Sequence, residues 1–250
     1  MSAERESPLD AARRMSAPAR QRRFYREATV SEHAGSYALH LDGKPARTPG
    51  NKPLAVTHTG LAEAIRAEWQ GQGEYLDAAT MPATRLANTA IDGVAPNMQA
   101  VRDEVAAYGG TDLLCYRAAE PETLVARERE IWDPILQAAE RRFGCRFVLA
   151  EGIVHVAQPD HALAAVRQAV EPYDDPFRLT ALHVVTALTG SALIALLLGE
   201  GVLDEGTAWA AAHVDEDFQI SRWGEDFEAQ ARRRKRHAEF GAAALVLSPS

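Results

Sequence analysis

The spacing of apolar and polar positions changes near residue 60, so the two parts of the chain predict different secondary structure. Before this point, apolar residues form short, partly alternating runs that are typical of β-strands. Segments rich in Gly and Pro separate the runs, and the dipeptide Asp42-Gly43 favours a tight hairpin. The sequence therefore predicts a hairpin or meander with strands over residues 23–30, 37–41 and 54–57.

From residue 60 onward, apolar residues recur at helical spacing, beginning with Leu61, Ile65 and Trp69. Later helices are expected over 81–92, 96–108, 121–143, 160–170 and 207–243, with another opened by Asp175-Pro176. Pro134 should kink or divide the helix over 121–143. A small hairpin over 146–150 and 153–156 is expected to interrupt the series.

Residues 179–198 contain no charged side chain, and the stretch is long enough to cross a bilayer. Polar residues such as His183 dilute its hydrophobicity, and no basic cluster or aromatic belt flanks it. A helix that is apolar all round is also typical of the centre of a helical domain. We therefore expect a buried core helix and no membrane insertion.

These patterns predict an α+β protein, with a small β-containing N-terminal domain followed by a larger, mostly α-helical C-terminal domain. The expected divisions are a disordered tail over 1–22, a small α/β domain over 23–78 and a helical domain over 79–250. The tail is rich in Arg, Ala and Ser, but its acids Glu4, Glu6 and Asp10 are unlike a mitochondrial transit peptide.

Charge and cysteine content narrow the class of partner and compartment. With 27 basic and 35 acidic side chains, the formal net charge is −8, and such a field repels the phosphates of nucleic acids. The two cysteines, Cys115 and Cys145, belong to no CxxC pair and are expected to be buried thiols in a reducing compartment.

Few residues have the spacing of a metal site, a catalytic site or a nucleotide-binding site. His213 and Asp217 are four positions apart and, with Asp215, make the best metal candidate, but further ligands are missing from the pattern. A solvated acidic patch is the simpler interpretation. The chain also lacks the glycine-rich phosphate loops and the hydrolase motif GxSxG. We therefore expect no catalytic residue, no cofactor, no metal site and no binding of ATP.

A polar stripe on the helix over 81–92 has two interpretations. An enzyme would use the stripe together with His155 or His183 in a cleft between the domains. A hydrogen-bond network between the domains requires no chemistry and is the simpler alternative. The stripe consists of Arg85, Asn88, Thr89 and Asp92.

The last predicted helix carries an a/d seam of residues that step by four and three positions. The seam consists of Trp209, His213, Glu216, Ile220, Trp223 and Phe227. Gly224 interrupts this helix and predicts a kink, and a basic run over 232–236 follows. One interpretation makes Trp223 a core residue, with the neighbouring acids paired to Arg232 and Arg233. A second makes the seam a surface for homo-oligomers.

Seven motifs in order resemble one specific family across about residues 23–240. The family comprises the assembly chaperones for the α subunit of the F-type ATP synthase, found in mitochondria and alphaproteobacteria. The motifs are LDGKPARTP, LAEAIRAEW, MPATRLANTAID, YGGTDLLCYRA, WDPIL, LAEGIVHV and HVDEDFQISRWGED.

The resemblance implies a molecular chaperone for ATP synthase assembly rather than an enzyme. Such a protein would bind the unassembled F1 α subunit, shield its β-facing interface until the hexamer assembles, and be a monomer when free. It would work in the bacterial cytoplasm, or in the mitochondrial matrix if the source is eukaryotic. The implied partner-binding residues are Asp215, Asp217, Trp223, Glu225 and Asp226; Phe227 departs from the polar residue common at its position.

Overall fold

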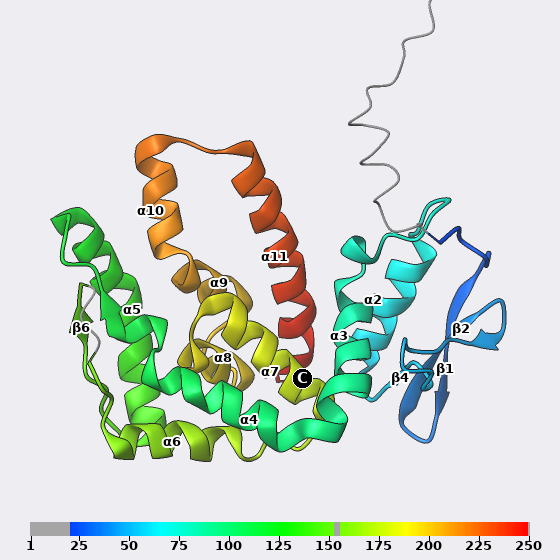
Figure 1. Ribbon diagram of the computed structural model, residues 1–250, viewed down its shortest axis with the longest axis horizontal. Helices are drawn as coiled ribbons and strands as arrows, with labels where there is room; N and C mark the ends of the chain where they lie inside the picture. The colour runs from blue at the N-terminus through cyan, green and yellow to red at the C-terminus, as the bar shows by residue number, and fades with distance from the viewer. Residues whose placement is uncertain (1–20, 153–155, 250) are drawn as a thin grey trace, which may run out of the picture.

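The N-terminal part of the chain forms a small antiparallel sheet, drawn in blue in Figure 1. The computed structural model describes residues 21–152 and 156–249, so the predicted tail lies largely outside it. The strands β1 (Ala28–His33), β2 (Ser36–Leu41) and β3 (Lys44–Pro45) are adjacent in that order, and β4 (Ala55–Val56) also pairs with β2. The first strand starts later than expected, and β3 lies in a segment predicted as a turn.

Two-residue turns close both hairpins. Ala34-Gly35 joins β1 to β2 with φ values of 50° and 76°, and Asp42-Gly43 joins β2 to β3 with 49° and 76°. Positive φ at both central residues gives a turn whose twist matches the twist of the paired strands. The hairpin predicted at Asp42-Gly43 is thereby confirmed.

Helices make up most of the remaining described chain. The helix α2 (Thr59–Gln70) packs on the sheet through its buried residues Leu61, Ala62 and Ile65. The α+β prediction is confirmed, with the sheet in the N-terminal part and the helices after it. The later helices are α3 (Pro82–Thr89), α4 (Met98–Ala107), α5 (Glu122–Phe143), α6 (Asp160–Val170), α7 (Pro176–Thr189), α8 (Ala192–Gly199), α9 (Glu205–Ala212), α10 (Val214–Trp223) and α11 (Phe227–Leu247).

The centre of the helical part is the uncharged stretch that resembled a membrane span. Every residue of α8 is buried, and α7 packs against α4, α8 and α11. The predicted core role of this stretch is therefore confirmed, but the prediction that it forms a single helix was wrong. Gly190 ends α7 with φ 70°, and the Ser191 side chain accepts a hydrogen bond from the Ile194 amide to start α8.

A buried carboxyl holds the start of α8 in place. Asp112 is fully buried and accepts hydrogen bonds from the Ser191 hydroxyl at 2.7 Å and the Leu193 amide at 3.0 Å. The Leu114 amide also donates to it at 3.1 Å. Burial raises the pKa of Asp112 to about 6, although these donors act in the opposite direction.

Three further expectations need correction. Pro134 does not divide α5, which runs unbroken over 22 residues. Of the expected hairpin, residues 146–149 form no strand, and β6 (Ala150–Glu151) pairs in parallel with β5 (Tyr116–Arg117); most of its second strand, 153–155, lies outside the described residues. The predicted final helix is three helices, because the chain turns at His213 and again at Gly224.

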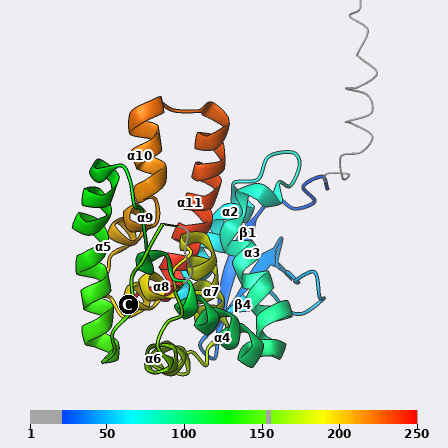
Figure 2. The same cartoon turned by 60° about the vertical axis from the view of Figure 1, so that its left-hand side comes forward.

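The C-terminal helix α11 connects the two parts of the fold. It packs against α7, α8 and α9 in the helical part and against α2 and α3 beside the sheet. Arg85 on α3 pairs with Glu239 on α11 at 2.7 Å. Figures 1 and 2 show that the first turns of α11 extend beyond this packed body, next to α10.

Candidate functional site

The predicted partner-binding residues lie on a helical hairpin that projects from the body in Figures 1 and 2. We call this hairpin the arm; it comprises residues 214–237, which include α10, the connection 224–226 and the first half of α11. Gly224 adopts φ 82° and ψ 178°, a conformation that is essentially restricted to glycine. Asp226 then caps α11 by accepting from the amides of Glu228 and Ala229, at 3.2 and 3.3 Å.

The tip of the arm exposes two large aromatic side chains. Trp223 ends α10 and is 84% exposed, and Phe227 begins α11 and is 78% exposed. The interpretation of Trp223 as a core residue was wrong. Phe227 was not among the partner-binding residues predicted from the sequence. Its position directly after the Gly-Glu-Asp break was the signal that could have identified it.

Acidic side chains accompany the aromatic residues at the tip. The Glu225 carboxylate forms no ion pair or hydrogen bond within the described ranges. It also borders a groove between α10 and α11 of about 400 Å³, whose other walls include Ile220 and Arg234. The tip thus combines apolar area with a carboxylate that is free for a partner.

The other two predicted acids lie at the base of the arm, not at its tip. Asp217 forms an ion pair with Arg233 and so joins α10 to α11. Asp215 contacts Glu128 on α5, where burial and the Asp215 carboxylate raise the pKa of Glu128. Since Asp215 and Trp223 are eight helical residues apart, about 12 Å separates these two levels of the arm.

The turn between α9 and α10 is built around a buried histidine. The His213 ring is 1% exposed, stacks on Trp209 with centroids 3.8 Å apart, and has Nδ1 2.8 Å from the Trp209 carbonyl oxygen. Burial lowers the pKa of His213. No group of three metal-ligating side chains gathers anywhere in residues 21–152 and 156–249.

Two residues of the polar stripe, Arg85 on α3 and Asp92 just after it, connect separate segments of the chain. Asp92 accepts from the Thr48 hydroxyl at 2.9 Å and from the Gly50 amide at 2.8 Å, which anchors the loop after β3. Arg85 reaches α11, as described above. For the enzyme interpretation, His183 pairs with Glu104 at 3.2 Å, and His155 lies outside the described residues.

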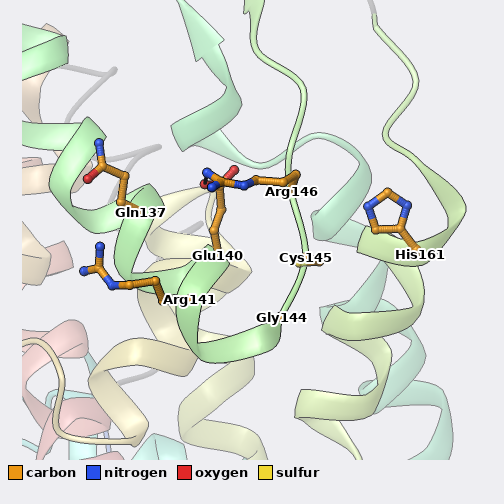
Figure 3. Close-up of a pocket in the computed structure, with 7 residues that line it drawn as sticks. All are labelled: Gln137, Glu140, Arg141, Gly144, Cys145, Arg146 and His161. Carbon is orange, nitrogen blue, oxygen red and sulfur yellow. Dashed lines mark hydrogen bonds and ion pairs between the residues drawn. The ribbon is translucent and has the colours of Figure 1, made fainter.

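A polar pocket of about 580 Å³ lies at the C-terminal end of α5 (Figure 3). Glu140 occupies one wall and binds Arg146 at 2.5 Å. The Cys145 thiol is buried, and burial together with Glu140 raises its pKa. No hydrogen bond joins Cys145 to His161 in the described part of the chain.

Comparison with known proteins shows the family. A family model described as the ATP12 chaperone protein matches residues 22–140. A crystal structure of Atp12 from Paracoccus denitrificans is 40% identical, covers 90% of this chain and 96% of its own, and superposes with a TM-score of 0.79. The chain belongs to the ATP12 chaperone family.

Two further relatives extend the likeness over most of the chain. A protein of known structure from Agrobacterium tumefaciens is 46% identical, covers 98% of this chain and 91% of its own, and has a TM-score of 0.85. The mitochondrial protein atp12 of Schizosaccharomyces pombe is 22% identical over 81% of this chain and 74% of its own length. The protein is thus a member of a chaperone family, as the motifs of the sequence indicated.

The helices bear on the question of a membrane span. None of the helices in the described ranges combines the length and the apolarity that a membrane crossing requires. The uncharged stretch is instead divided between two helices and buried in the core.

Proposed function

We propose that this chaperone acts in ATP synthase assembly by binding the unassembled α subunit of the F1 sector. It covers the surface by which that subunit later contacts a β subunit, and it releases the subunit when the hexamer assembles. Membership of the ATP12 family supports the assembly role, and the sequence motifs direct it to the α subunit. The role is one of binding, without catalysis or cofactor, by a monomer in the bacterial cytoplasm or the mitochondrial matrix.

The observation that carries this proposal is the exposed aromatic pair at the tip of the arm. Trp223 and Phe227 together present large apolar area to solvent, and tryptophan is enriched among residues that dominate binding energy. Glu225 and Asp226 add negative charge, which selects a partner of complementary charge. The contact therefore consists of these four residues, with Asp215 and Asp217 supporting it from the base.

An arm of this kind suits a client that must later be released. A reversible complex needs a moderate interface, roughly 800 Å² per partner, rather than the extensive apolar interface of an obligate dimer. Two aromatic anchors with acidic neighbours supply affinity from a few residues. A β subunit that offers a larger complementary surface then displaces the chaperone.

The test is capture of the F1 α subunit during co-expression with chaperone variants. Trp223→Ala, Phe227→Ala and Glu225→Lys should each reduce the α subunit that remains soluble and co-purifies, and the double aromatic variant should abolish capture. Val202→Ala is the matched control, since Val202 is also apolar and 48% exposed but lies outside the arm. A folded double aromatic variant that still protects the α subunit as well as the native protein would contradict the proposal.

The role of Asp226 needs a substitution that preserves the helix cap. Asp226→Lys removes both the charge and the cap, whereas Asp226→Asn keeps an acceptor for the α11 amides. Weaker capture by Asp226→Asn with an unchanged melting temperature would assign the charge to the client contact.

Sedimentation separates this function from homo-oligomer formation through the same aromatic residues. The free protein should sediment as a monomer. A dimer that Trp223→Ala dissociates would favour the oligomer instead.

A further inference from the structure

A second exposed aromatic surface lies on the sheet rather than on the arm. A cavity of about 380 Å³ is lined by residues before β1, by the β2–β3 hairpin and by the end of α2. Phe24 is 61% exposed and meets Tyr25 edge-on with ring centroids 5.4 Å apart, and Tyr25 lies 5.5 Å from Trp69. Pro45 of β3 also lines the cavity, so its walls include three aromatic rings and a proline.

Hydrogen bonds hold these walls in place without a ligand. The Tyr25 hydroxyl donates to the Trp69 carbonyl oxygen at 2.6 Å. Arg23 lies 4.7 Å above the Tyr25 ring and donates to the Gln72 carbonyl oxygen at 2.6 Å. A cavity whose walls are already ordered loses little conformational entropy when a ligand binds.

The cavity has a positively charged rim in a protein of net charge −8. Lys44 and Arg47 border it, and neither forms an ion pair with any residue in the described ranges. Asp42 is the acid at the rim, and its carboxylate already accepts from the backbone amides of Arg26 and Glu27 at 3.0 and 2.9 Å. Arg47 donates to the Asn51 carbonyl oxygen at 2.8 Å, but this neutral acceptor leaves its positive charge unpaired, so both cations can attract an acidic ligand.

A buried donor in the wall lacks an acceptor. The Trp69 indole Nε1 is buried and has no hydrogen-bond partner among the described residues. Such an unpaired buried donor costs free energy.

We propose that this cavity binds an extended, acidic, proline-containing segment of a partner protein. Aromatic grooves accept proline-rich peptides because these are already extended and lose little entropy on binding. Phe24, Trp69 and Pro45 supply the apolar contact, and Lys44 and Arg47 attract the acidic residues of the segment. The surface is independent of the arm and of the client proposed for it.

The experiment is an NMR titration of the full-length protein with the peptide acetyl-Glu-Pro-Pro-Leu-Pro-Pro-Glu-amide. Binding should shift the Trp69 indole N–H resonance with a dissociation constant below about 1 mM. A peptide with Lys in place of both Glu residues should bind at least tenfold more weakly. The double variant Lys44→Glu and Arg47→Glu should reverse this preference, a result that loss of folding cannot produce.

Two variants distinguish binding in the cavity from nonspecific binding to exposed aromatic side chains. Phe24→Ala should weaken binding of the acidic peptide at least tenfold, whereas Tyr75→Ala should not, since Tyr75 is 49% exposed and does not line the cavity. The proposal is overturned if the two peptides bind equally, if the indole resonance does not move, or if Phe24→Ala dissociates a dimer of the free protein. That last outcome would identify a second copy of the chain as the occupant.

Discussion

Arg233 on α11 and Asp217 on α10 form an ion pair between the two helices of the arm, and Arg236 and Glu216 form a longer one at 3.8 Å. The Arg233 and Asp217 side chains are partly shielded, with 22% and 31% of their area exposed. Asp217→Asn should therefore lower the free energy of unfolding by only about 1 kcal/mol, as for most exposed pairs. The local effect should be larger: amide exchange along α10 should accelerate relative to that of α8.

The charge-reversed pair is the control for this prediction. Asp217→Arg combined with Arg233→Asp should restore slow exchange along α10, whereas either change alone should not. If the single variants leave α10 exchange unchanged, the pair does not hold the arm together.

Gly224 permits the sharp turn at the tip. Gly224→Ala places a side chain at φ 82° and ψ 178°, which should cost about 1–3 kcal/mol through backbone strain, although an added Cβ meets no atom within 4 Å. Gly73→Ala is the matched control, because its Cβ also meets open space and its φ lies outside the left-handed region. Urea unfolding should show a clearly lower free energy of unfolding for Gly224→Ala and little change for Gly73→Ala. Equal stability of the two would show that the turn is not strained by a side chain.

Glu68 on α2 caps the beginning of α3. Its carboxylate accepts from the amides of Ala83 and Thr84 at 2.6 and 2.8 Å. Glu68→Ala removes both acceptors and should lower the free energy of unfolding by about 2 kcal/mol. Glu63→Ala on the same helix loses only an exposed pair with Arg66 and should cost less than about 0.5 kcal/mol. Similar losses for both variants in thermal unfolding would refute the capping role.

Asp112 should make stability depend on pH. Because burial raises the pKa of Asp112 to about 6, above the 3.8 that is ordinary for an aspartate, the folded protein binds this proton more tightly than the unfolded chain. Its contribution to stability is complete below about pH 3.8 and is lost as the pH rises through about 6. The loss amounts to as much as about 3 kcal/mol.

Asp112→Asn isolates this effect from other titrating groups. The difference in unfolding free energy between the native protein and Asp112→Asn should favour the native protein most near pH 4 and shrink towards pH 7. A difference that stays constant across this range would show that Asp112 ionises equally in the folded and unfolded states.

Local patterns in the sequence were sufficient to predict whether most segments form strands or helices. Positive-φ dipeptides such as Asp42-Gly43 determine hairpins through neighbouring residues alone, and periodic apolar positions determine where helices bury a face. The absence of charge over residues 179–198 likewise indicated a core segment. The break at Gly190 was not predicted, because a single glycine between apolar residues is compatible with either one helix or two.

The candidate site depended on information that no local pattern contains. The 3.6-residue period placed Trp223 and Phe227 on one seam with Trp209, as in a single helix, and this suggested a buried Trp223. In the structure α11 turns back beside α10 and packs on α7, so Trp209 stays in the body while Trp223 and Phe227 reach solvent. Local sequence therefore determined which segments are helical and, at Gly224, one of the places where they break. Only the tertiary packing decided which residues the breaks expose, because burial depends on segments that are distant in the chain.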